Sequence, residues 1–494
     1  MAYNHGVYVS EAATSLLPVV SVTAGIPFII GTAPVNMTDP ANVNKPVLVS
    51  SYAEAVAAFG FVPAATDAKS GLKKFAFTIS EFLYSQFKLF GVGPAVVVNV
   101  LDPAKHKVTA DTVKVTLDVK TGAATVAEAG ILPESVTLTG SSGAYVEGTD
   151  YTLAFDDDGT LIVTSLKNGS GDFLCATGED LTFAAERLDP SLVSAEDIIG
   201  GVDVATGAKT GLELVAECFP RFGVVPGLIL APGFAKSAGV IAAMTTAAKA
   251  INGVFNALAI VDLPTDKVTK YSEVNAWKNE NNVTDPQQIA CWPMLALDGT
   301  VFNQSTQLAG LLGEVDGDND DVPYVSPSNK NYQMTSAVLE DGTEVWLGID
   351  EANMVNGLGV VTALNFVGGW KCWGNRTAAY PSNTDVKDAF IPIRRMFGWV
   401  GNTFVQTFWQ RVDYPLNRRQ IDTIVDSANV WMNGLTAKQY ILGGKVEFLA
   451  EDNTTTDLMD GKARFHVSLT PPSPNREISF VLEYDPDNLQ ALFS

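Results

Sequence analysis

The sequence is poor in the residue types on which several protein classes depend. Its 494 residues include 32 Lys and Arg against 55 Asp and Glu, a formal net charge of −23 at pH 7. Contacts with phosphate groups need clustered Lys and Arg, so this balance argues against a protein that binds nucleic acid. The three histidines, His5, His106 and His466, lie far apart in the sequence. Neither a zinc cluster nor a His-based catalytic triad is visible in their spacing.

Cysteines and long apolar runs are also scarce. The four cysteines, Cys175, Cys218, Cys291 and Cys372, show no C-x-x-C spacing, which predicts buried free thiols in a reducing compartment. The opening MAYNHGVYVS lacks the basic and apolar regions of a signal peptide. The longest weakly charged stretch, 237–261, contains Lys249 and Gly253 and favours a helix followed by a strand over a membrane span. We therefore expect a soluble protein made in the cytoplasm, with no direct insertion into a membrane.

Two segments approach known ligand-binding motifs without completing them. In GVDVATGAKT, 201–210, Ala208 separates Gly207 from Lys209, whereas a phosphate-binding P-loop needs Gly directly before Lys. In DGDNDD, 316–321, Asp stands at the sixth position, where an EF-hand calcium loop needs Gly, and a Pro replaces the final Glu. We expect no catalytic residues, no metal, no cofactor and no enzymatic activity. An α/β enzyme with an unrecognised site stays open as an alternative.

The pattern that is present predicts a multi-domain, mixed α/β fold. Short apolar runs such as PGLILAP, ALAIVDLP and IACWPMLAL alternate with helical stretches after residue 210, which is typical of a largely parallel, doubly wound sheet. Farther on, Ile393, Phe397, Val400, Phe404 and Phe408 recur at helical spacing, and a second amphipathic helix follows Asn417. Two long amphipathic helices therefore precede the end of the chain.

A stretch with the pattern of short β-strands interrupts the α/β pattern. Between residues 105 and 189, short alternating runs such as VKVTLDV and TLIVTSL are separated by Gly, Ser and Asp. From 102 to 197 there are six Lys and Arg against seventeen Asp and Glu, a net charge of −11. These features predict a small, acidic, all-β domain inserted into the α/β framework and facing solvent.

The end of the chain raises a choice between two structures. Phe465, Val467 and Leu469 alternate with polar residues. After the linker PPSPNR, a second alternating run contains Ile478, Phe480, Leu482 and Tyr484, with Glu477, Ser479, Val481 and Glu483 at the positions between them. Both runs have the period of a strand buried on one face. The linker is too long and too rich in proline for a two-residue hairpin turn. The runs therefore form either a wide-looped hairpin or a strand that leads into an arm leaving the domain.

Taken in order, several motifs resemble those of one family. They are HGVYVSE at the start, GTAP after an apolar strand, SPSNK at 326–330, GW-x-x-WGNRT at 369–377, IRR at 393–395 and NREISF near the end. In this combination the chain is similar to the contractile tail sheath proteins of myophages and phage-tail-like particles. The resemblance implies a structural subunit that forms hexameric rings stacked around an inner tube, and whose contraction drives that tube through a target envelope. Its partners would be further copies of itself, the tube protein, and baseplate and tail terminator proteins, in a virion tail or a similar particle.

The resemblance also assigns roles to parts of the chain. We divide it into an N-terminal arm (1–20), a first part of the α/β core (21–104), an inserted β-rich outer domain (105–190), a doubly wound α/β domain (191–345), a C-terminal sheath domain next to the tube (346–475) and a C-terminal arm (476–494). Family members donate terminal extensions to a neighbour's sheet. The candidate strands for such exchange contain Val7, Tyr8, Val9, Phe465, Val467, Ile478, Phe480 and Leu482. An internal hairpin remains an alternative for Phe465 and Val467.

The stretch 370–420 carries a local excess of positive charge. Eight Lys and Arg stand there against three Asp, a net charge of +5 in an acidic chain. A basic segment of this kind favours a face directed at an acidic partner. We expect Arg394, Arg395, Arg418 and Arg419 to face the tube, although ordinary solvated or internally paired arginines are the alternative. Another tail component, such as a non-contractile tube or a baseplate protein, is a second reading of the whole chain.

Overall fold

The centre of the molecule is an eight-stranded sheet, seen in a computed structural model that describes residues 17–38 and 41–493. Its strand order is β2-β5-β1-β17-β18-β19-β23-β24. The strands are β1 (Pro27–Gly31), β2 (Val47–Val49), β5 (Ala95–Asn99), β17 (Leu228–Leu230), β18 (Leu258–Asp262), β19 (Gln288–Cys291), β23 (Val360–Phe366) and β24 (Gly369–Trp373). The six strands from β5 to β23 are parallel, and β2 and β24 pair antiparallel at the two edges. The predicted mixed α/β class is confirmed.

Parallel strands of this kind are covered on both faces, which is why they are nearly continuous apolar runs. All residues of β1, β5 and β18 are buried. The covering helices are α1 (Tyr52–Phe59), α2 (Thr78–Leu83), α3 (Ala195–Ile199), α4 (Cys218–Phe222), α5 (Ala238–Lys249), α6 (Val274–Glu280), α7 (Gln304–Gly317) and α8 (Ile349–Asn356). A π-helical turn, Tyr84–Leu89, continues α2. Helix α7 is buried on almost all sides, so it belongs to the core of the body.

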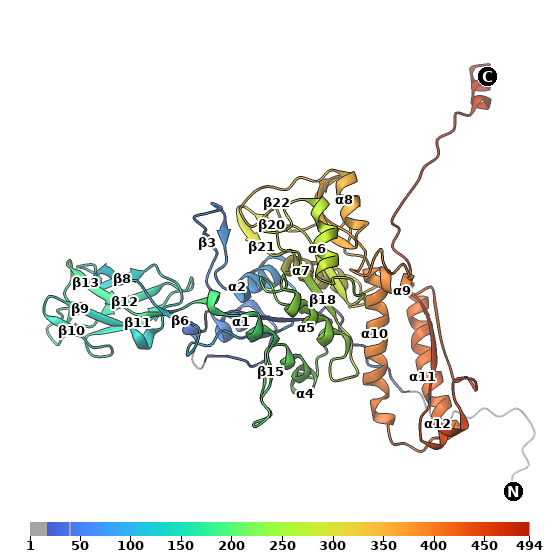
Figure 1. Ribbon diagram of the computed structural model, residues 1–494, viewed down its shortest axis with the longest axis horizontal. Helices are drawn as coiled ribbons and strands as arrows, with labels where there is room; N and C mark the ends of the chain where they lie inside the picture. The colour runs from blue at the N-terminus through green and yellow to red at the C-terminus, as the bar shows by residue number, and fades with distance from the viewer. Residues whose placement is uncertain (1–16, 39–40, 494) are drawn as a thin grey trace, which may run out of the picture.

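A second, smaller sheet lies beside the central one. It has the order β22-β20-β21-β4-β3 and consists of β3 (Ala65–Thr66), β4 (Lys73–Lys74), β20 (Met294–Leu297), β21 (Thr300–Phe302) and β22 (Ser336–Val338). A separate hairpin of β15 (Gly201–Val202) and β16 (Lys209–Thr210) projects from the body (Figure 1).

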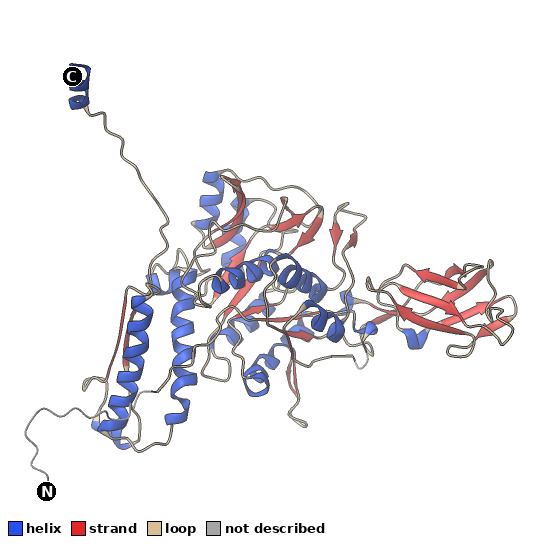
Figure 2. Ribbon diagram, turned by 180° about the vertical axis from the view of Figure 1, so that it is seen from behind, coloured by secondary structure: helices blue, strands red, loops and turns tan. Residues whose placement is uncertain are grey.

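The inserted stretch forms a lobe at one end of the molecule (Figures 1 and 2). A sheet of order β10-β9-β13-β7 and a sheet of order β11-β12-β8 share one apolar core. The strands are β7 (Val113–Thr116), β8 (Ala123–Val126), β9 (Thr137–Gly140), β10 (Gly143–Tyr145), β11 (Tyr151–Phe155), β12 (Leu161–Ser165) and β13 (Asp180–Ala184). A neck of β6 (Lys107–Thr109) and β14 (Glu186–Leu188) joins the lobe to the body. The division of the chain into six domains remains a proposal.

The opposite end of the molecule is a hairpin of two long helices, α10 (Ile391–Phe408) and α11 (Arg418–Ala437), preceded by the short α9 (Val386–Ala389). A two-stranded sheet of β25 (Gly443–Glu447) and β26 (His466–Thr470) lies on α11. The helix α12 (Thr455–Met459) belongs to the connection that joins the two strands. After β26 the chain leaves the body as an extended segment that ends in the 3₁₀ turn Pro486–Phe493 (Figures 1 and 2). Among the described helices, none is both long enough and apolar enough to cross a membrane.

Candidate functional site

The helical hairpin is built from two amphipathic sequences whose apolar faces meet. Pro392 occupies the first turn of α10, and the side chain of Asn417 caps α11 by accepting a hydrogen bond from the N–H of Gln420 at 3.0 Å. The shared core contains Met396, Trp399, Val400, Met432 and Leu435. The rings of Trp399 and Trp431 are 5.3 Å apart, which locks the two helices together.

Arg395 lies inside this end of the molecule and does not reach its surface. Its side chain is 2% exposed and forms a two-pronged ion pair with the carboxylate of Asp316 on α7, which is 1% exposed. It also donates to the carbonyl of Ala24 at 3.4 Å. Burial raises the pKa of Asp316, and the charge of Arg395 opposes that rise. The prediction that Arg395 faces the tube is therefore wrong, because Asp316, 79 residues away in sequence, holds it in the core.

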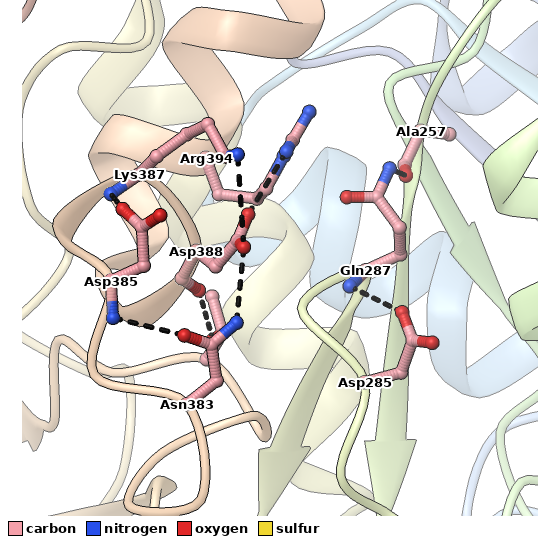
Figure 3. Close-up of polar contacts among 9 residues, drawn as sticks. Ala257, Asp285, Gln287, Asn383, Asp385, Lys387, Asp388 and Arg394 are labelled. Carbon is pink, nitrogen blue, oxygen red and sulfur yellow. Dashed lines mark hydrogen bonds and ion pairs between the residues drawn. The ribbon is translucent and has the colours of Figure 1, made fainter.

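Arg394 is also largely committed to partners inside the chain. Its guanidinium lies 3.3 Å from the carboxylate of Asp388, which additionally accepts a hydrogen bond from Asn383 at 3.0 Å (Figure 3). The side chain of Arg394 is 18% exposed. This arrangement fixes α9 against the start of α10 and leaves little of the Arg394 charge for a partner.

Arg418 and Arg419 stand at the free end of the hairpin, where α11 begins. Both are exposed, and Arg418 pairs with Asp422 one turn later at 2.9 Å. The connecting loop between the helices exposes several large apolar side chains, namely Trp409, Val412, Tyr414 and Leu416. Arg411 lies 5.1 Å from the centre of the Tyr414 ring. Three arginines of the basic stretch, Arg411, Arg418 and Arg419, therefore lie at this tip, and Arg411 was not among the residues expected from the sequence to face the tube.

The sheet of β25 and β26 has one closed and one open edge. The side chain of Asn429 on α11 donates to the carbonyl of Val446 and accepts from its N–H, both at 2.9 Å. Val446 thus turns its main chain away from β26 and toward α11. In an antiparallel pair its partner Val467 must turn its own N–H and C=O to the other side, the outer edge of β26. Among the described residues, nothing bonds these outward groups of Val467.

The last run of alternating apolar residues has no partner in the described chain. Ile478 is 67% exposed, Phe480 86% and Leu482 94%, in an extended segment without strand pairing. Val467 lies in β26, which pairs with β25 of the same chain, and Phe465 precedes that strand with its ring 5.4 Å from Phe448. The two terminal runs therefore do not form a hairpin with each other. Val7, Tyr8 and Val9 lie outside the described residues.

Two of the motifs that carry the family resemblance, SPSNK and GW-x-x-WGNRT, lie side by side at the edge of the central sheet. The N–H of Asn329 in SPSNK donates to the carbonyl of Cys372 at 2.7 Å, and the N–H of Gly374 donates to the hydroxyl of Ser328 at 3.1 Å. SPSNK thereby covers the outer edge of β24. In the neighbouring GNRT, the guanidinium of Arg376 sits 3.7 Å from the centre of the Phe390 ring, at the residue that precedes α10. These motifs join the central sheet to the helical hairpin.

Two buried carboxylates that sequence reasoning missed hold the start of α7. Glu81 accepts hydrogen bonds from the N–H of Asn303 at 2.7 Å and from the hydroxyl of Thr306 at 2.9 Å. Asp262, at the end of β18, accepts from the N–H and hydroxyl of Ser305. Burial raises the pKa of Glu81 to about 8 and that of Asp262 to about 6. Every one of these bonds goes to the first turn of α7, so both groups serve its capping.

The segments that approached ligand-binding motifs have structural roles. Residues 201–210 form the hairpin of β15 and β16. In DGDNDD, Asp316 pairs with Arg395, and Asp320 accepts from Lys438 at 2.9 Å and from the hydroxyl of Tyr440. The part of the chain that the structure describes contains no group of three His, Cys, Asp or Glu side chains that could hold a metal ion.

A body with an uncovered apolar arm and an open strand edge is the architecture of a subunit that completes its contacts in an assembly. No model of a known protein family matches the chain. It is 29% identical to the tail sheath protein of Burkholderia phage BcepMu over 516 residues, covering 99% of this chain and 98% of that protein. It is 26% identical to the tail sheath protein of Escherichia phage P2, covering 63% of this chain and 73% of that protein.

Solved structures of the same kind share the fold. The sheath of the PVC extracellular contractile injection system in its contracted state gives a TM-score of 0.57 at 12% identity, covering 99% of each chain. The contracted helical sheath of the anti-feeding prophage gives 0.57 at 13% identity, covering 98% of this chain and all of that one. The recognition made from the motifs is confirmed, because the chain is similar along almost its whole length to a tail sheath protein, which is a structural protein and not an enzyme. It also shares the fold of the contracted sheaths of phage-like injection systems.

Proposed function

We propose that the chain is the subunit of a contractile tail sheath that assembles as stacked hexameric rings around an inner tube and contracts to drive the tube through a target envelope. The observation that carries this proposal is the uncovered arm of a chain that is similar to a tail sheath protein along its whole length. Its partners are further copies of itself, the tube protein, the baseplate and a tail terminator, in a virion tail or a phage-tail-like particle.

The C-terminal arm supplies the contacts between copies. An extended segment covering 471–485 can reach about 50 Å, enough to leave one subunit and lie on the next. Its Ile478, Phe480 and Leu482 alternate as in a strand buried on one face, and outside an assembly they would be exposed to water and to aggregation. Pairing with another subunit would cover the apolar face and satisfy the main chain.

The outer edge of β26 in a neighbouring subunit is the acceptor best supported by the structure. The side chain of Asn429 binds both the N–H and the C=O of Val446, so no further strand can pair with β25 at that position. The outward N–H and C=O of Val467, in contrast, are free of partners among the described residues. A strand from a second copy can therefore add to β26 by main-chain hydrogen bonds. The N-terminal strand with Val7, Tyr8 and Val9 would take part in the same exchange.

The free end of the helical hairpin is proposed as the face that meets the tube. Arg411, Arg418 and Arg419 lie there together with exposed aromatic side chains, in a chain with a net charge of −23. Arg and aromatic residues are the types enriched where protein surfaces bind each other. The acidic insert lies at the opposite end of the molecule (Figure 1), which suits an outer surface where like-charged copies are spaced apart.

Negative-stain microscopy of the purified protein tests the sheath assembly, and Phe480→Pro tests the arm. Proline removes a main-chain donor from the donated strand, so we expect wild type to form ring stacks or tubes and the variant to remain as folded single subunits. Ser473→Pro, in the proline-rich linker of the same arm, is the matched control and should assemble. Val467→Pro should block the acceptor edge in the same way. Tubes formed by Phe480→Pro would contradict strand donation by the arm.

A further inference from the structure

The segment Leu17–Ala24, called the strap below, lies extended across the helical hairpin and is held almost entirely by helix side chains. The N–H of Leu17 donates to the hydroxyl of Ser427 on α11 at 2.8 Å. The N–H groups of Val20 and Val22 donate to the hydroxyls of Thr407 and Thr403 on α10, at 3.1 and 3.4 Å. In the other direction, the indole N–H of Trp399 donates to the carbonyl of Val22 at 2.6 Å, and Arg395 donates to the carbonyl of Ala24.

The four α10 residues in this set are spaced by four, at positions 395, 399, 403 and 407. Four residues of an α-helix rise about 6.0 Å, and two residues of an extended chain span about 6.6 Å. One turn of α10 therefore matches two residues of the strap. Arg395 and Trp399, one turn apart, bind the carbonyls of Ala24 and Val22, and Thr403 and Thr407, the next such pair, bind the N–H groups of Val22 and Val20. The match of one turn to two residues holds within each pair, and the two pairs, both antiparallel to the strap, meet at Val22.

The burial of the hydroxyls shows that the helix face is adapted to the strap. Thr403 is 0% exposed, Thr407 1% and Ser427 2%. A buried hydroxyl without a partner costs about 1–3 kcal/mol. The strap is the partner that the structure gives to the hydroxyl oxygens of both threonines. Ser427 also donates to the carbonyl of Thr423 at 2.6 Å, so its hydroxyl is satisfied in both directions only when Leu17 is in place.

The strap is fixed at its other end to the core of the body. Arg395, which binds Ala24, is paired with the buried Asp316, and a Cβ atom on Gly25 would lie 3.1 Å from the carboxylate of Asp316. The carbonyl of Ile26 then accepts from Gly227, and the chain enters the central strand β1. The strap, which begins with the last four residues of the N-terminal arm, thus ties the arm to both the helical hairpin and the central sheet.

We propose that the strap is a clamp that fixes where the N-terminal arm leaves the subunit, and that Thr403, Thr407 and Ser427 are its positioning residues. With the strap bound, the arm starts from the middle of α11 beside Ser427. With the strap released, it would start from Gly25, eight residues later in the chain, and its strand could reach several acceptor positions. The clamp restricts the arm to one acceptor, which gives the lattice one geometry. This inference rests on the proposed exchange of arms.

The test replaces the three hydroxyl groups in the full-length chain, as Thr403→Val, Thr407→Val and Ser427→Ala together. Thr436→Val is the matched control, because Thr436 is on the same hairpin and its hydroxyl bonds only within α11, to the carbonyl of Met432. Amide hydrogen exchange of the unassembled subunit is measured over residues 17–24 and over α10. We expect exchange at Val20 and Val22 to rise by about tenfold or more in the triple variant, with α10 unchanged.

Assembly is then compared by microscopy. We expect the control to form regular tubes and the triple variant to form irregular or mixed assemblies. Regular tubes from a triple variant whose strap exchanges fast would overturn the positioning role, and so would a strap that exchanges no faster than in the control. Val20→Pro removes the N–H of the strap that binds Thr407. It provides a second test and should form the same irregular or mixed assemblies as the triple variant. If wild type forms no tubes, the proposed function fails, whereas the exchange measurement still decides whether the hydroxyls hold the strap.

Discussion

Replacing Arg395 should destabilise the helical hairpin far more than replacing any arginine at its tip. Arg395 and Asp316 have side chains that are 2% and 1% exposed, and they pair with each other in a two-pronged geometry. Arg395→Met keeps a side chain of similar length but leaves the Asp316 carboxylate buried without its counter-charge. Removing one member of a buried pair costs about 3–5 kcal/mol, mainly through the charge that is left behind. The lost bond to Ala24 adds to this cost.

The matched control is Arg418→Met at the tip. The Arg418 side chain is 84% exposed and pairs with Asp422 within one helical turn. Exposed pairs of this spacing contribute about 0.3–0.5 kcal/mol. The opening free energy of α10, measured by amide hydrogen exchange in the unassembled subunit, should therefore fall strongly for Arg395→Met and hardly at all for Arg418→Met.

The double variant Arg395→Met, Asp316→Leu separates the charge effect from the packing effect. Replacing a whole buried pair by apolar side chains is often neutral, so the double variant should be more stable than Arg395→Met alone. In Arg395→Met the opposing charge is gone, so burial should raise the pKa of Asp316 further than in wild type. A carboxyl group with a raised pKa in the folded state binds protons that the unfolded state has released, so the single variant should recover stability as the pH falls.

Two results would refute this reasoning. One is a similar loss of stability for Arg395→Met and Arg418→Met. The other is a double variant whose loss of stability equals the sum of the losses measured for Arg395→Met alone and for Asp316→Leu alone. If the prediction holds, charge reversal at Arg395 cannot be used to test contact with the tube, because failed assembly would report a damaged subunit. Reversal at Arg418 and Arg419 is the appropriate experiment.

Three further predictions concern other parts of the molecule. Burial raises the pKa of Glu81 from 4.5 to about 8, so wild-type stability should fall as the pH rises between these values, and Glu81→Gln should flatten that dependence in thermal unfolding at pH 5 and pH 8. Gln86 is fully buried, and neither of its amide atoms has a partner among the described residues, so Gln86→Met should stabilise the subunit by about 1–3 kcal/mol in urea unfolding, and a loss of stability would contradict this. Deleting residues 110–185 with a short Gly/Ser bridge across the antiparallel neck should leave tube formation intact in microscopy, whereas folded subunits that no longer assemble would place lattice contacts in the lobe.

The elements that could be predicted from the sequence are those whose pattern is local. The buried parallel strands are short apolar runs between helices, and α10 and α11 are long periodic stretches with recognisable starts. The acidic lobe was predicted from the short alternating runs, separated by Gly, Ser and Asp, that stand between the strand β5 and the helix α3. In each case the residues that decide the structure lie within one element or next to it.

The contacts that could not be predicted join residues far apart in the sequence. Asp316 belongs to an acidic run that resembles a surface loop, and nothing near it indicates that Arg395 will enter the core beside it. Asn429 looks like an ordinary helix residue, although its amide closes the edge of β25. Polar side chains have the same local pattern whether they face water or a main chain, so only the tertiary structure distinguishes these cases.

Helix α10 shows how such a contact changes even the reading of a periodic sequence. The apolar residues Ile393, Phe397, Val400, Phe404 and Phe408 predict one buried face, but of these only Ile393 and Val400 are fully buried. The buried face is rotated toward Arg395, Trp399, Thr403 and Thr407, the residues that bind the strap. An extended segment brings unpaired N–H and C=O groups to the helix, and these need polar partners that exclude water. Apolar periodicity identifies the face that packs against side chains, whereas a face that packs against main chain must carry polar groups. On α10 the second requirement turns Thr403 and Thr407 inward and leaves Phe404 and Phe408 at the margin of the core.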